Sequence, residues 1–360
     1  MVSRLGGDFD FRIVTLDRDF GDSTPFPGFA ERGWCELGKA KVLYLAPEAV
    51  SVRSVARIIQ ELQPQCVYLN GFFDPCFTQR VLWARRFGLI SSVNIVLAPR
   101  GEFSESALLI NAAKKKIYLW FARFLGIYGG VRWHVSSSQE RDDLIRVFRF
   151  VSARDIKIAL NLAPPVSRSG EVRRCPRPTN HSLRVCFLGR VAPMKNLDFA
   201  LRVLAQVKCS VIFTVYGPLE SENYWSECKS LIDGISSNVR VVYEGQLRPE
   251  VVKESLAKHD LFFFPTRGEN YGHVIHEALA AGLPVLISDR TPWARVEGAG
   301  VGWCVPLSAV SEFVQIIEDV ASWTEAEHLR VRACALAFAA ETAGDADTLE
   351  RNRDVFCFGN

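Results

Sequence analysis

The sequence predicts an α/β protein made of two doubly wound domains that face a cleft. Short apolar runs alternate with longer amphipathic stretches, and the alternation occurs twice, on either side of a segment rich in Pro, Arg and Ser. Strands that alternate with helices favour parallel sheets covered on both faces. Such sheets bind ligands beyond the carboxyl ends of their strands. A chain of 360 residues has room for two domains of ordinary size.

Each half contains its own series of elements. In the first half, strands are expected at 11–16, 41–45, 66–70 and 94–99 and helices over 52–62, 78–88 and 106–126, while 133–148 is typical of a strand, a loop and a helix that begins near Gln139. In the second half, strands are expected at 184–189, 210–217, 239–245, 260–265 and 283–288, with helices that begin near Asn196, Ser221, Pro249, Gly272 and Ser308. The predicted organisation is a first domain at 1–162, a linker at 163–182, a second domain at 183–325 and closing helices at 326–360.

The composition excludes several classes of protein. The chain is 48% hydrophobic and 23% charged, which is typical of a globular protein with a buried core. A net charge of +3 without a long basic block argues against nucleic acid as the main partner. The ten cysteines are scattered and form no C-x-x-C pair, which argues against a zinc site and a disulfide framework and favours a reducing compartment. With no signal-peptide pattern and no apolar run of roughly 18 residues, we expect a cytoplasmic protein.

Two carboxylates around a Tyr-Gly step suggest a ligand site in the second half. Glu269 follows the strand at 260–265 and therefore lies in a loop at the ligand-binding edge. Gly272 lies at the start of the next helix, where free N–H groups and the positive dipole end favour an anion. Glu277 is five residues further along, roughly 7 Å along the helix axis. A nucleotide sugar has a matching layout of sugar, diphosphate and ribose.

A second cluster of residues supports the same ligand. Gly189 and Arg190 end the strand at 184–189, and Lys195 precedes the next helix. Arg offers a fixed fork to phosphate oxygens and Lys offers a point charge. Together they could neutralise a diphosphate leaving group without a metal ion, so we expect neither a metal nor a cofactor. His273, His276 and Glu277 do not have the spacing of a zinc motif, and two helical His residues are more often surface or packing residues.

These motifs together resemble the donor-binding half of retaining glycosyltransferases of family four, whose two Rossmann-like domains form the GT-B fold. The matching pieces between 184 and 306 are GR-x4-KN, the VYG turn at 215–217, EGQL at 244–247, and Glu-x7-Glu followed by EALAAGLPVLISD. The first half is similar to part of that family at 68–78, 97–108, 114–116 and 133–140. The closing helices, ending in NRDVF, look like the tail that crosses back to the first domain.

The resemblance implies a role for each matching residue. Arg190 and Lys195 would hold the diphosphate, Glu269 would contact the donor sugar near the reacting carbon, and Glu277 would bind the ribose hydroxyls. The remaining donor-side residues would line the phosphate, sugar and base positions: Gly189, Gly217, Gly245, Gln246, Leu247, Asn270, Tyr271, Gly272 and His273. Asn161 falls where relatives carry the Asn that ends the first domain. The implied reaction is sugar transfer with retention to a glycan or lipid-linked acceptor, in surface polysaccharide biosynthesis.

The sequence departs from the family pattern in two places. Arg100, in the acceptor-side loop with Gly101 and Glu102, stands where many relatives carry His. Because Arg cannot act as a base, we expect it to bind phosphate or a charged acceptor. The family's first domain opens with a strand and a glycine-rich loop, whereas 1–19 resembles the end of the first helix and the strand after it. We therefore expect the opening strand to be missing and the first sheet to have a gap with an exposed strand edge.

Alternatives remain for the function and for one surface segment. A non-catalytic nucleotide-binding family member and a GT-B nucleotide-sugar epimerase are the other candidate functions. The segment 114–126 is basic and then aromatic and apolar. It could be a helix packed on the first sheet with its lysines in water, or a patch for peripheral contact with the inner face of the membrane near a lipid-linked acceptor.

Overall fold

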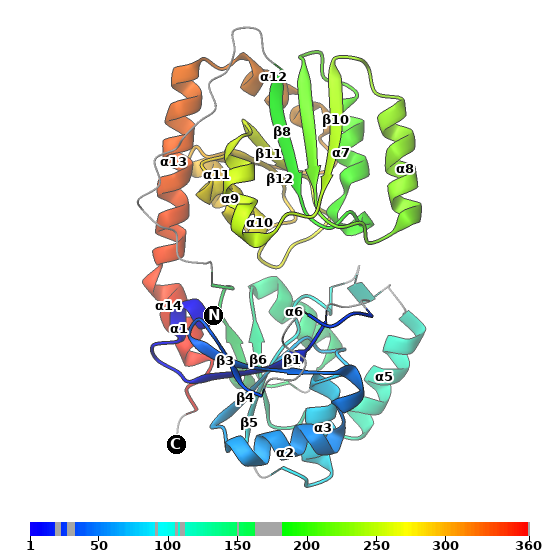
Figure 1. Ribbon diagram of the computed structural model, residues 1–360, viewed down its shortest axis with the longest axis vertical. Coiled ribbons are helices and arrows are strands. Elements are labelled where there is room, and N and C mark those ends of the chain that lie inside the picture. Colours follow the sequence, from blue (N-terminus) through cyan, green and yellow to red (C-terminus); the bar gives the residue numbers. More distant parts are fainter. Residues whose placement is uncertain are drawn as a thin grey trace. The chain divides into compact units, whose positions relative to one another are not determined.

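The chain divides into two compact units. The computed structural model describes residues 1–18, 23–26, 33–90, 93–104, 107–108, 112–149, 151–162 and 182–358. The first unit is Met1–Pro164 with Asp345–Asn360, and the second is Pro165–Gly344 (Figure 1). The predicted linker at 163–182 lies outside the described residues, apart from Ser182. The closing helices were predicted as one segment from 326, but residues up to Gly344 belong to the second unit and only those from Asp345 belong to the first.

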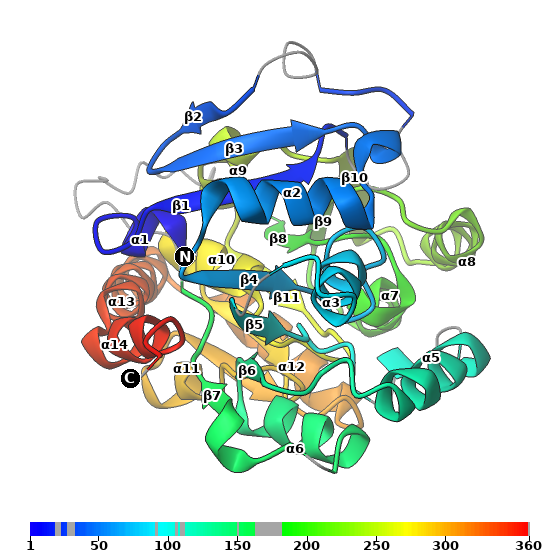
Figure 2. The same cartoon turned by 90° about the horizontal axis from the view of Figure 1, so that it is seen from below.

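The first unit contains two separate sheets (Figure 2). In one sheet, β1 (Phe11–Leu16) pairs in parallel with β3 (Ala40–Leu45), which pairs in antiparallel with β2 (Cys35–Leu37). The other is parallel throughout, in the order β4 (Cys66–Asn70), β5 (Asn94–Ala98), β6 (Val131–Val135), β7 (Ile156–Ile158). The helices described in this unit are α1 (Val2–Leu5), α2 (Val52–Leu62), α3 (Thr78–Arg86), α5 (Ala112–Phe124), α6 (Ser138–Val147) and α14 (Ala346–Asp354).

In the described part of the first unit, β1 and β4 are edge strands of different sheets. Among the described residues, β1 pairs only with β3 on one side and β4 pairs only with β5. Phe356, which follows α14, contacts both edge strands, with ring centroids 6.0 Å from Phe11 of β1 and 5.6 Å from Tyr68 of β4. An aromatic side chain near the end of the chain therefore contacts one strand of each sheet, while the expected gap in the first sheet and the missing opening strand stay predictions.

The second unit is built on one parallel sheet. Its order is β10 (Val239–Gly245), β9 (Val211–Tyr216), β8 (Leu183–Leu188), β11 (Leu261–Phe264), β12 (Val285–Ser288), β13 (Gly302–Val305). All residues of the central strands β11 and β12 are buried, as expected for continuous apolar runs in a sheet covered on both faces. The helices are α7 (Leu197–Leu204), α8 (Glu222–Asp233), α9 (Pro249–Ala257), α10 (His273–Ala280), α11 (Arg295–Gly298), α12 (Val310–Ser322) and α13 (Glu325–Gly344).

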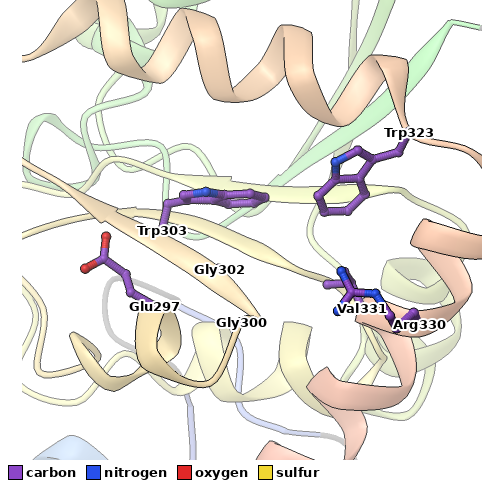
Figure 3. A pocket seen from close by; sticks show the side chains of 7 residues that line it. All are labelled: Glu297, Gly300, Gly302, Trp303, Trp323, Arg330 and Val331. Carbon is purple, nitrogen blue, oxygen red and sulfur yellow. The ribbon is translucent and has the colours of Figure 1, made fainter.

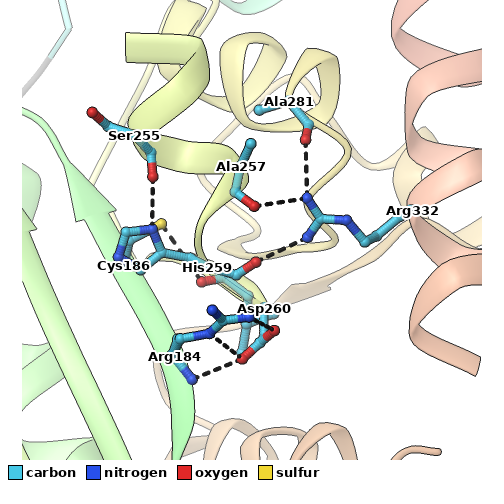
Figure 4. Close-up of polar contacts among 9 residues, drawn as sticks. Arg184, Cys186, Ser255, Ala257, His259, Asp260, Ala281 and Arg332 are labelled. Carbon is cyan, nitrogen blue, oxygen red and sulfur yellow. Dashed lines mark hydrogen bonds and ion pairs between the residues drawn. The ribbon is translucent and has the colours of Figure 1, made fainter. Parts of the chain in front are cut away.

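A buried arginine fixes α13 to the second unit (Figure 4). Arg332 is 2% exposed and donates to the carbonyl oxygens of His259 at 2.9 Å, Ala257 at 2.9 Å and Ala281 at 3.4 Å. These three oxygens lie at or beyond the ends of α9 and α10, where helix carbonyls lack partners within the helix. The 326–344 segment therefore stays with the second unit because a buried guanidinium must keep its acceptors.

The structure corrects the predicted elements in two respects and describes part of a third. The first sheet is not purely parallel, because β2 runs antiparallel to β3. The sequence reasoning missed the short strands β2, β7 and β13, which have only three or four residues and too little periodicity to be recognised. The helix expected over 106–126 is described from Ala112 to Phe124 as α5, and part of the remainder lies outside the described residues.

Candidate functional site

Three glycine turns lie side by side at the carboxyl edge of the second sheet. Gly189 follows β8, Gly217 follows β9 and Gly245 ends β10, and these strands are neighbours. Gly189 N–H donates to Tyr216 O at 3.0 Å, and Gly217 N–H donates to Gly245 O at 2.8 Å. A Cβ on Gly217 would lie 2.0 Å from Gly189 O, and its φ of 139° is one that side chains rarely adopt. Because the three glycines have no side chains, a ligand can closely approach the backbone at this edge of the sheet.

The loops after β8 and β11 are tied to each other. Asn196, whose φ is 63°, donates from Nδ2 to Pro265 O at 2.9 Å. Arg267 Nε donates to Asn196 Oδ1 at 2.9 Å, and Arg267 N–H donates to Met194 O at 2.9 Å. The left-handed Asn196 ends the short helical turn Pro193–Lys195 and starts α7. These bonds fix Lys195 of one loop beside Glu269 of the other, 74 positions apart in the chain.

The structure brings Lys195 and Glu269 together as an ion pair. Lys195 Nζ donates to Glu269 Oε1, and both side chains are mostly buried, at 17% and 13% exposed. The ammonium also lies 5.6 Å from the centre of the Phe264 ring. Glu269 is held from the other side, because its N–H donates to Arg290 O at 3.0 Å. The pair therefore places one positive and one negative group at the carboxyl end of β11, each compensating the other.

Arg190 is directed elsewhere. Its guanidinium pairs with Glu220 in the loop after β9, and the two side chains are 61% and 47% exposed. An exposed pair of this kind contributes little to stability. Arg190 is consequently close to the glycine edge but bound to a surface carboxylate from which a phosphate could displace it.

The start of α10 is shaped by aromatic packing. Gly272, with a φ of 78°, is the residue before the helix, and a Cβ there would lie 2.8 Å from Ile275 Cδ1. Tyr271 is buried, its ring lies edge-on to Trp293 at 5.4 Å, and its carbonyl accepts from Trp293 Nε1. Burial raises the pKa of Tyr271 to about 12. His273 is exposed as the first helical residue, and its ring centroid is 4.7 Å from that of Tyr271.

Glu277 is a half-buried carboxylate on α10. Among the described residues, its carboxylate makes no hydrogen bond or ion pair. Burial raises the pKa of Glu277 above its ordinary value. A half-buried charged carboxylate usually has hydrogen bonds or an ion pair that offset its lost hydration, and Glu277 has neither among the described residues. It is the arrangement expected of a carboxylate whose hydrogen-bond partner is a ligand.

The other predicted donor-side residues lie at the same edge. Gly245 ends β10, and Gln246 and Leu247 follow it in the loop before α9. Gly245 has a φ of 74° and open space where a Cβ would be. Asn270 lies between Glu269 and Tyr271 and is partly exposed.

The acceptor-side residues are bound within the first unit. Arg100 donates from Nε to Asn70 at 2.7 Å, from Nη2 to the Tyr68 hydroxyl at 2.9 Å and from Nη1 to Asn161. Tyr68 and Asn70 belong to β4, and Asn161 follows β7. Arg100 itself follows β5, so its bonds connect three strands of one sheet near their carboxyl ends. A phosphate at Arg100 would have to replace bonds that hold this edge.

Two further carboxylates, the half-buried Glu102 and the buried Glu140, hold backbone N–H groups near this edge. Glu102 accepts from the N–H groups of Phe72 at 2.5 Å and Phe73 at 2.9 Å, and burial raises its pKa. Gly101 N–H donates to Glu140 Oε1 at 2.6 Å, and Glu140 is 4% exposed. Gly101 and Glu102 are therefore part of the loop framework, which the sequence did not reveal.

A metal would have to compete with packing contacts at α10. His276 is 2% exposed, and its Nε2 lies 3.2 Å from Ala339 O of α13. Within the described ranges, no group of three or more His, Cys, Asp or Glu side chains is placed to hold a metal ion.

A separate pocket of about 250 Å³ lies away from these residues (Figure 3). It is lined by Glu297, Gly300, Gly302, Trp303, Trp323, Arg330 and Val331. Gly302 begins β13, which is parallel to β12, so the pocket lies at the amino edge of the sheet. The two indole rings contact each other, with centroids 5.8 Å apart. The predicted residues lie at the opposite, carboxyl edge.

Comparisons with known proteins find matches to part of the chain and to its fold. Residues 182–322 match the family model described as glycosyl transferases group 1. Over 166 residues the chain is 29% identical to D-inositol 3-phosphate glycosyltransferase of Mycolicibacterium smegmatis, a match that covers 42% of this chain and 38% of that protein. The chain thus matches well under half of the length of this curated relative.

Solved structures resemble nearly the whole chain. HepE of Anabaena in complex with UDP superposes with a TM-score of 0.64 at 15% identity, over 96% of this chain and 98% of that one. WaaG, a glycosyltransferase involved in lipopolysaccharide biosynthesis, superposes with a TM-score of 0.60 at 15% identity, over 97% and 100%. The chain has the GT-B fold. The sequence predicted this fold of two Rossmann-like units.

Three supporting residues of this GT-B chain were not predicted. Glu220 pairs with Arg190, Arg267 links the two loops, and Trp293 supports Tyr271. Each acts through a contact between segments that are far apart in the chain, so no local spacing could have identified it.

Proposed function

We propose that the chain is a glycosyltransferase that moves a sugar from a nucleotide-sugar donor to an acceptor. The observation that carries the proposal is the Lys195–Glu269 ion pair at the same sheet edge as Glu277, whose carboxylate has no partner among the described residues. These three residues belong to the segment that matches group 1 glycosyl transferases. The HepE structures, in complex with UDP and with UDP-glucose, support a uridine donor as the first one to test.

Each group has a task when a donor binds. The diphosphate attracts Lys195, which leaves Glu269 and neutralises the departing charge together with Arg190. Glu269, no longer paired, accepts hydrogen bonds from the donor sugar. Glu277 accepts from the ribose diol, which supplies the partners that its carboxylate lacks. The backbone N–H groups at the start of α10 face phosphate or sugar oxygens.

The proposed reaction retains the configuration of the sugar, as in family four. The bond between the anomeric carbon and the diphosphate oxygen breaks, and the acceptor oxygen attacks the same face. The leaving phosphate oxygen takes the proton of the acceptor hydroxyl. No other base is required, which is consistent with an Arg100 that is bound in its loop.

The acceptor is proposed to be a glycan or a lipid-linked oligosaccharide. WaaG is involved in lipopolysaccharide biosynthesis, and a similar role in making a surface polysaccharide on the cytoplasmic side follows by analogy.

The first experiment is a thermal-shift titration with UDP, GDP and ADP. We expect one nucleotide to stabilise the chain but not the Arg190→Ala, Lys195→Ala variant. The matched control is Lys229→Ala, Lys258→Ala, which removes two exposed cations of the same unit and should keep the shift. If no nucleotide stabilises a chain that melts cooperatively, the donor site is not functional and the proposal fails.

Turnover then separates the candidate functions. Release of nucleotide diphosphate that depends on an added acceptor supports transfer. Binding without turnover, with every acceptor and donor tried, supports the non-catalytic family member. Conversion of the donor alone to its epimer supports a GT-B epimerase.

A further inference from the structure

The pocket at the amino edge of the second sheet is lined by two tryptophans (Figure 3). Trp303 lies on β13, and Trp323 directly follows α12. Both side chains are partly exposed, and their ring planes are tilted by 36° at a centroid distance of 5.8 Å. Neither indole N–H donates a hydrogen bond to another described residue. The two rings therefore leave flat apolar surface and two hydrogen-bond donors available at the pocket.

One acidic and one basic side chain border the same pocket. Figure 3 shows Glu297 of α11 and Arg330 of α13 at its opposite ends. Glu297 Oε1 accepts from the Cys304 N–H at 3.0 Å, and its other oxygen has no partner in the described part of the chain. Arg330 is exposed and forms no ion pair within the described ranges. Glu327, one turn earlier on α13, instead accepts from the Thr324 N–H at 2.7 Å. The pocket thus has a free acceptor at one end and free donors at the other, and the two formal charges cancel.

The size of the pocket limits its ligand to a single ring. Its volume is about 250 Å³, whereas sites for drug-sized ligands begin at roughly 300 Å³. Gly300, which has a φ of 64°, has open space where a Cβ would be, so bare backbone borders the pocket there. A six-membered ring with its substituents fits this space, and a nucleotide sugar is too large for it.

We propose that this pocket binds one neutral pyranose ring of a glycan. The C–H groups on the faces of a pyranose pack against indole faces, which carry partial negative charge. Its hydroxyls accept hydrogen bonds from Arg330 and the indole N–H groups, and one of them donates to Glu297. An anion fits less well because Glu297 repels it, and a cation fits less well because Arg330 does. The proposal does not depend on the transfer reaction, since the Lys195–Glu269 pair lies at the opposite edge of the sheet.

Saturation-transfer NMR on the full chain tests the proposal. The probes are the methyl glycosides of glucose, galactose, mannose and rhamnose, each titrated to obtain a Kd. Because a single ring makes few contacts, we expect at least one of them to bind saturably with a Kd of about 1 mM. Arg330→Gln and Trp303→Leu should each weaken that binding by about fivefold or more, because each removes a hydrogen-bond donor. Methyl glucuronide, which carries a carboxylate, should bind no more tightly than methyl glucoside.

The matched controls are Arg240→Gln and Trp225→Leu. They remove an exposed cation of β10 and a partly exposed indole of α8, both in the same unit and outside the pocket. Each control should bind the glycoside as tightly as the unchanged chain does. Since Arg330 is exposed, Arg330→Gln should keep the melting temperature, and it tests the pocket even if Trp303→Leu lowers the stability of the fold.

Three results overturn the proposal. The first is that no glycoside binds saturably with a Kd below about 10 mM. The second is that Arg330→Gln and Trp303→Leu bind as tightly as their controls. The third is that Glu269→Gln abolishes the binding, because the glycoside would then occupy the carboxyl edge of the sheet instead of this pocket.

Discussion

Replacing Glu277 with Gln should weaken donor binding without destabilising the fold. The carboxylate is half-buried on α10 and has no partner among the described residues, and burial raises its pKa. A raised carboxyl pKa means that the charged form is disfavoured in the folded state. The charge therefore costs stability at neutral pH, and this cost disappears as the pH falls through the folded-state pKa. Gln has the same shape without the charge, so the melting temperature at neutral pH should stay the same or rise.

The loss in binding follows from the type of hydrogen bond. Hydrogen bonds to a charged group contribute roughly 1.5–3 kcal/mol, and neutral ones about 1 kcal/mol. For two ribose hydroxyls the substitution should cost about 2 kcal/mol, which is roughly a 30-fold weaker nucleotide. In the unchanged chain, binding should also weaken as the pH falls and Glu277 takes up a proton. The amide of the Glu277→Gln variant cannot titrate, so that variant should lack this pH dependence.

Isothermal titration with the nucleotide identified by thermal shift measures both effects. Glu227→Gln is the control, because Glu227 is an exposed glutamate within α8 of the same unit. It should leave affinity and melting temperature unchanged. The reasoning is refuted if Glu277→Gln binds as tightly as the unchanged chain. It is also refuted if the variant melts well below it, since Glu277 would then be stabilising the fold.

Three further predictions concern the second unit. Gly217→Ala should abolish nucleotide binding and lower the melting temperature, because its Cβ would lie 2.0 Å from Gly189 O; nucleotide thermal shift measures both, and an unaltered shift would contradict the close approach of the two turns. Arg332→Met should cost about 3 kcal/mol by leaving buried carbonyls unpaired, a fall of roughly 6–12 °C for a unit of this size; calorimetry measures it, and a fall of a degree or less would rule out the anchoring role. Burial lowers the pKa of His259 from 6.5 to about 4, so its contribution to stability is present above pH 6.5 and is lost as the pH falls toward 4. His259→Asn should flatten the melting temperature over that range, and an identical pH profile would show that His259 does not control it.

The sequence predicted most strands of both units because their signals are local. β8, β9, β10, β11 and β12 are apolar runs between turn residues, and the structure places each within two residues of its predicted bounds. The Lys195–Glu269 site was recognisable because both residues follow strands of one parallel sheet, whose carboxyl ends must meet. Polar contacts between loops left no such signal. The bonds of Arg100 to Tyr68 and Asn161 depend on how side chains turn after the strands assemble, and the residue was therefore predicted to be free for a ligand.

In the second sheet, the amino ends of the strands carry stabilising contacts, whereas the carboxyl ends carry features that lower the stability of the fold. Toward the amino ends of the strands, Arg184 and Asp260 form a two-pronged ion pair, and Arg332 saturates the carbonyls nearby. Toward the carboxyl ends, Gly217 holds a backbone conformation that side chains rarely adopt, and Glu277 is half-buried with no counter-charge among the described residues. Both edges belong to the same sheet, so the difference cannot come from strand packing. A fold under selection for stability alone would gain by neutralising Glu277. Its cost is offset only if a ligand supplies the missing hydrogen bonds, which is why the carboxyl edge is where a donor should bind.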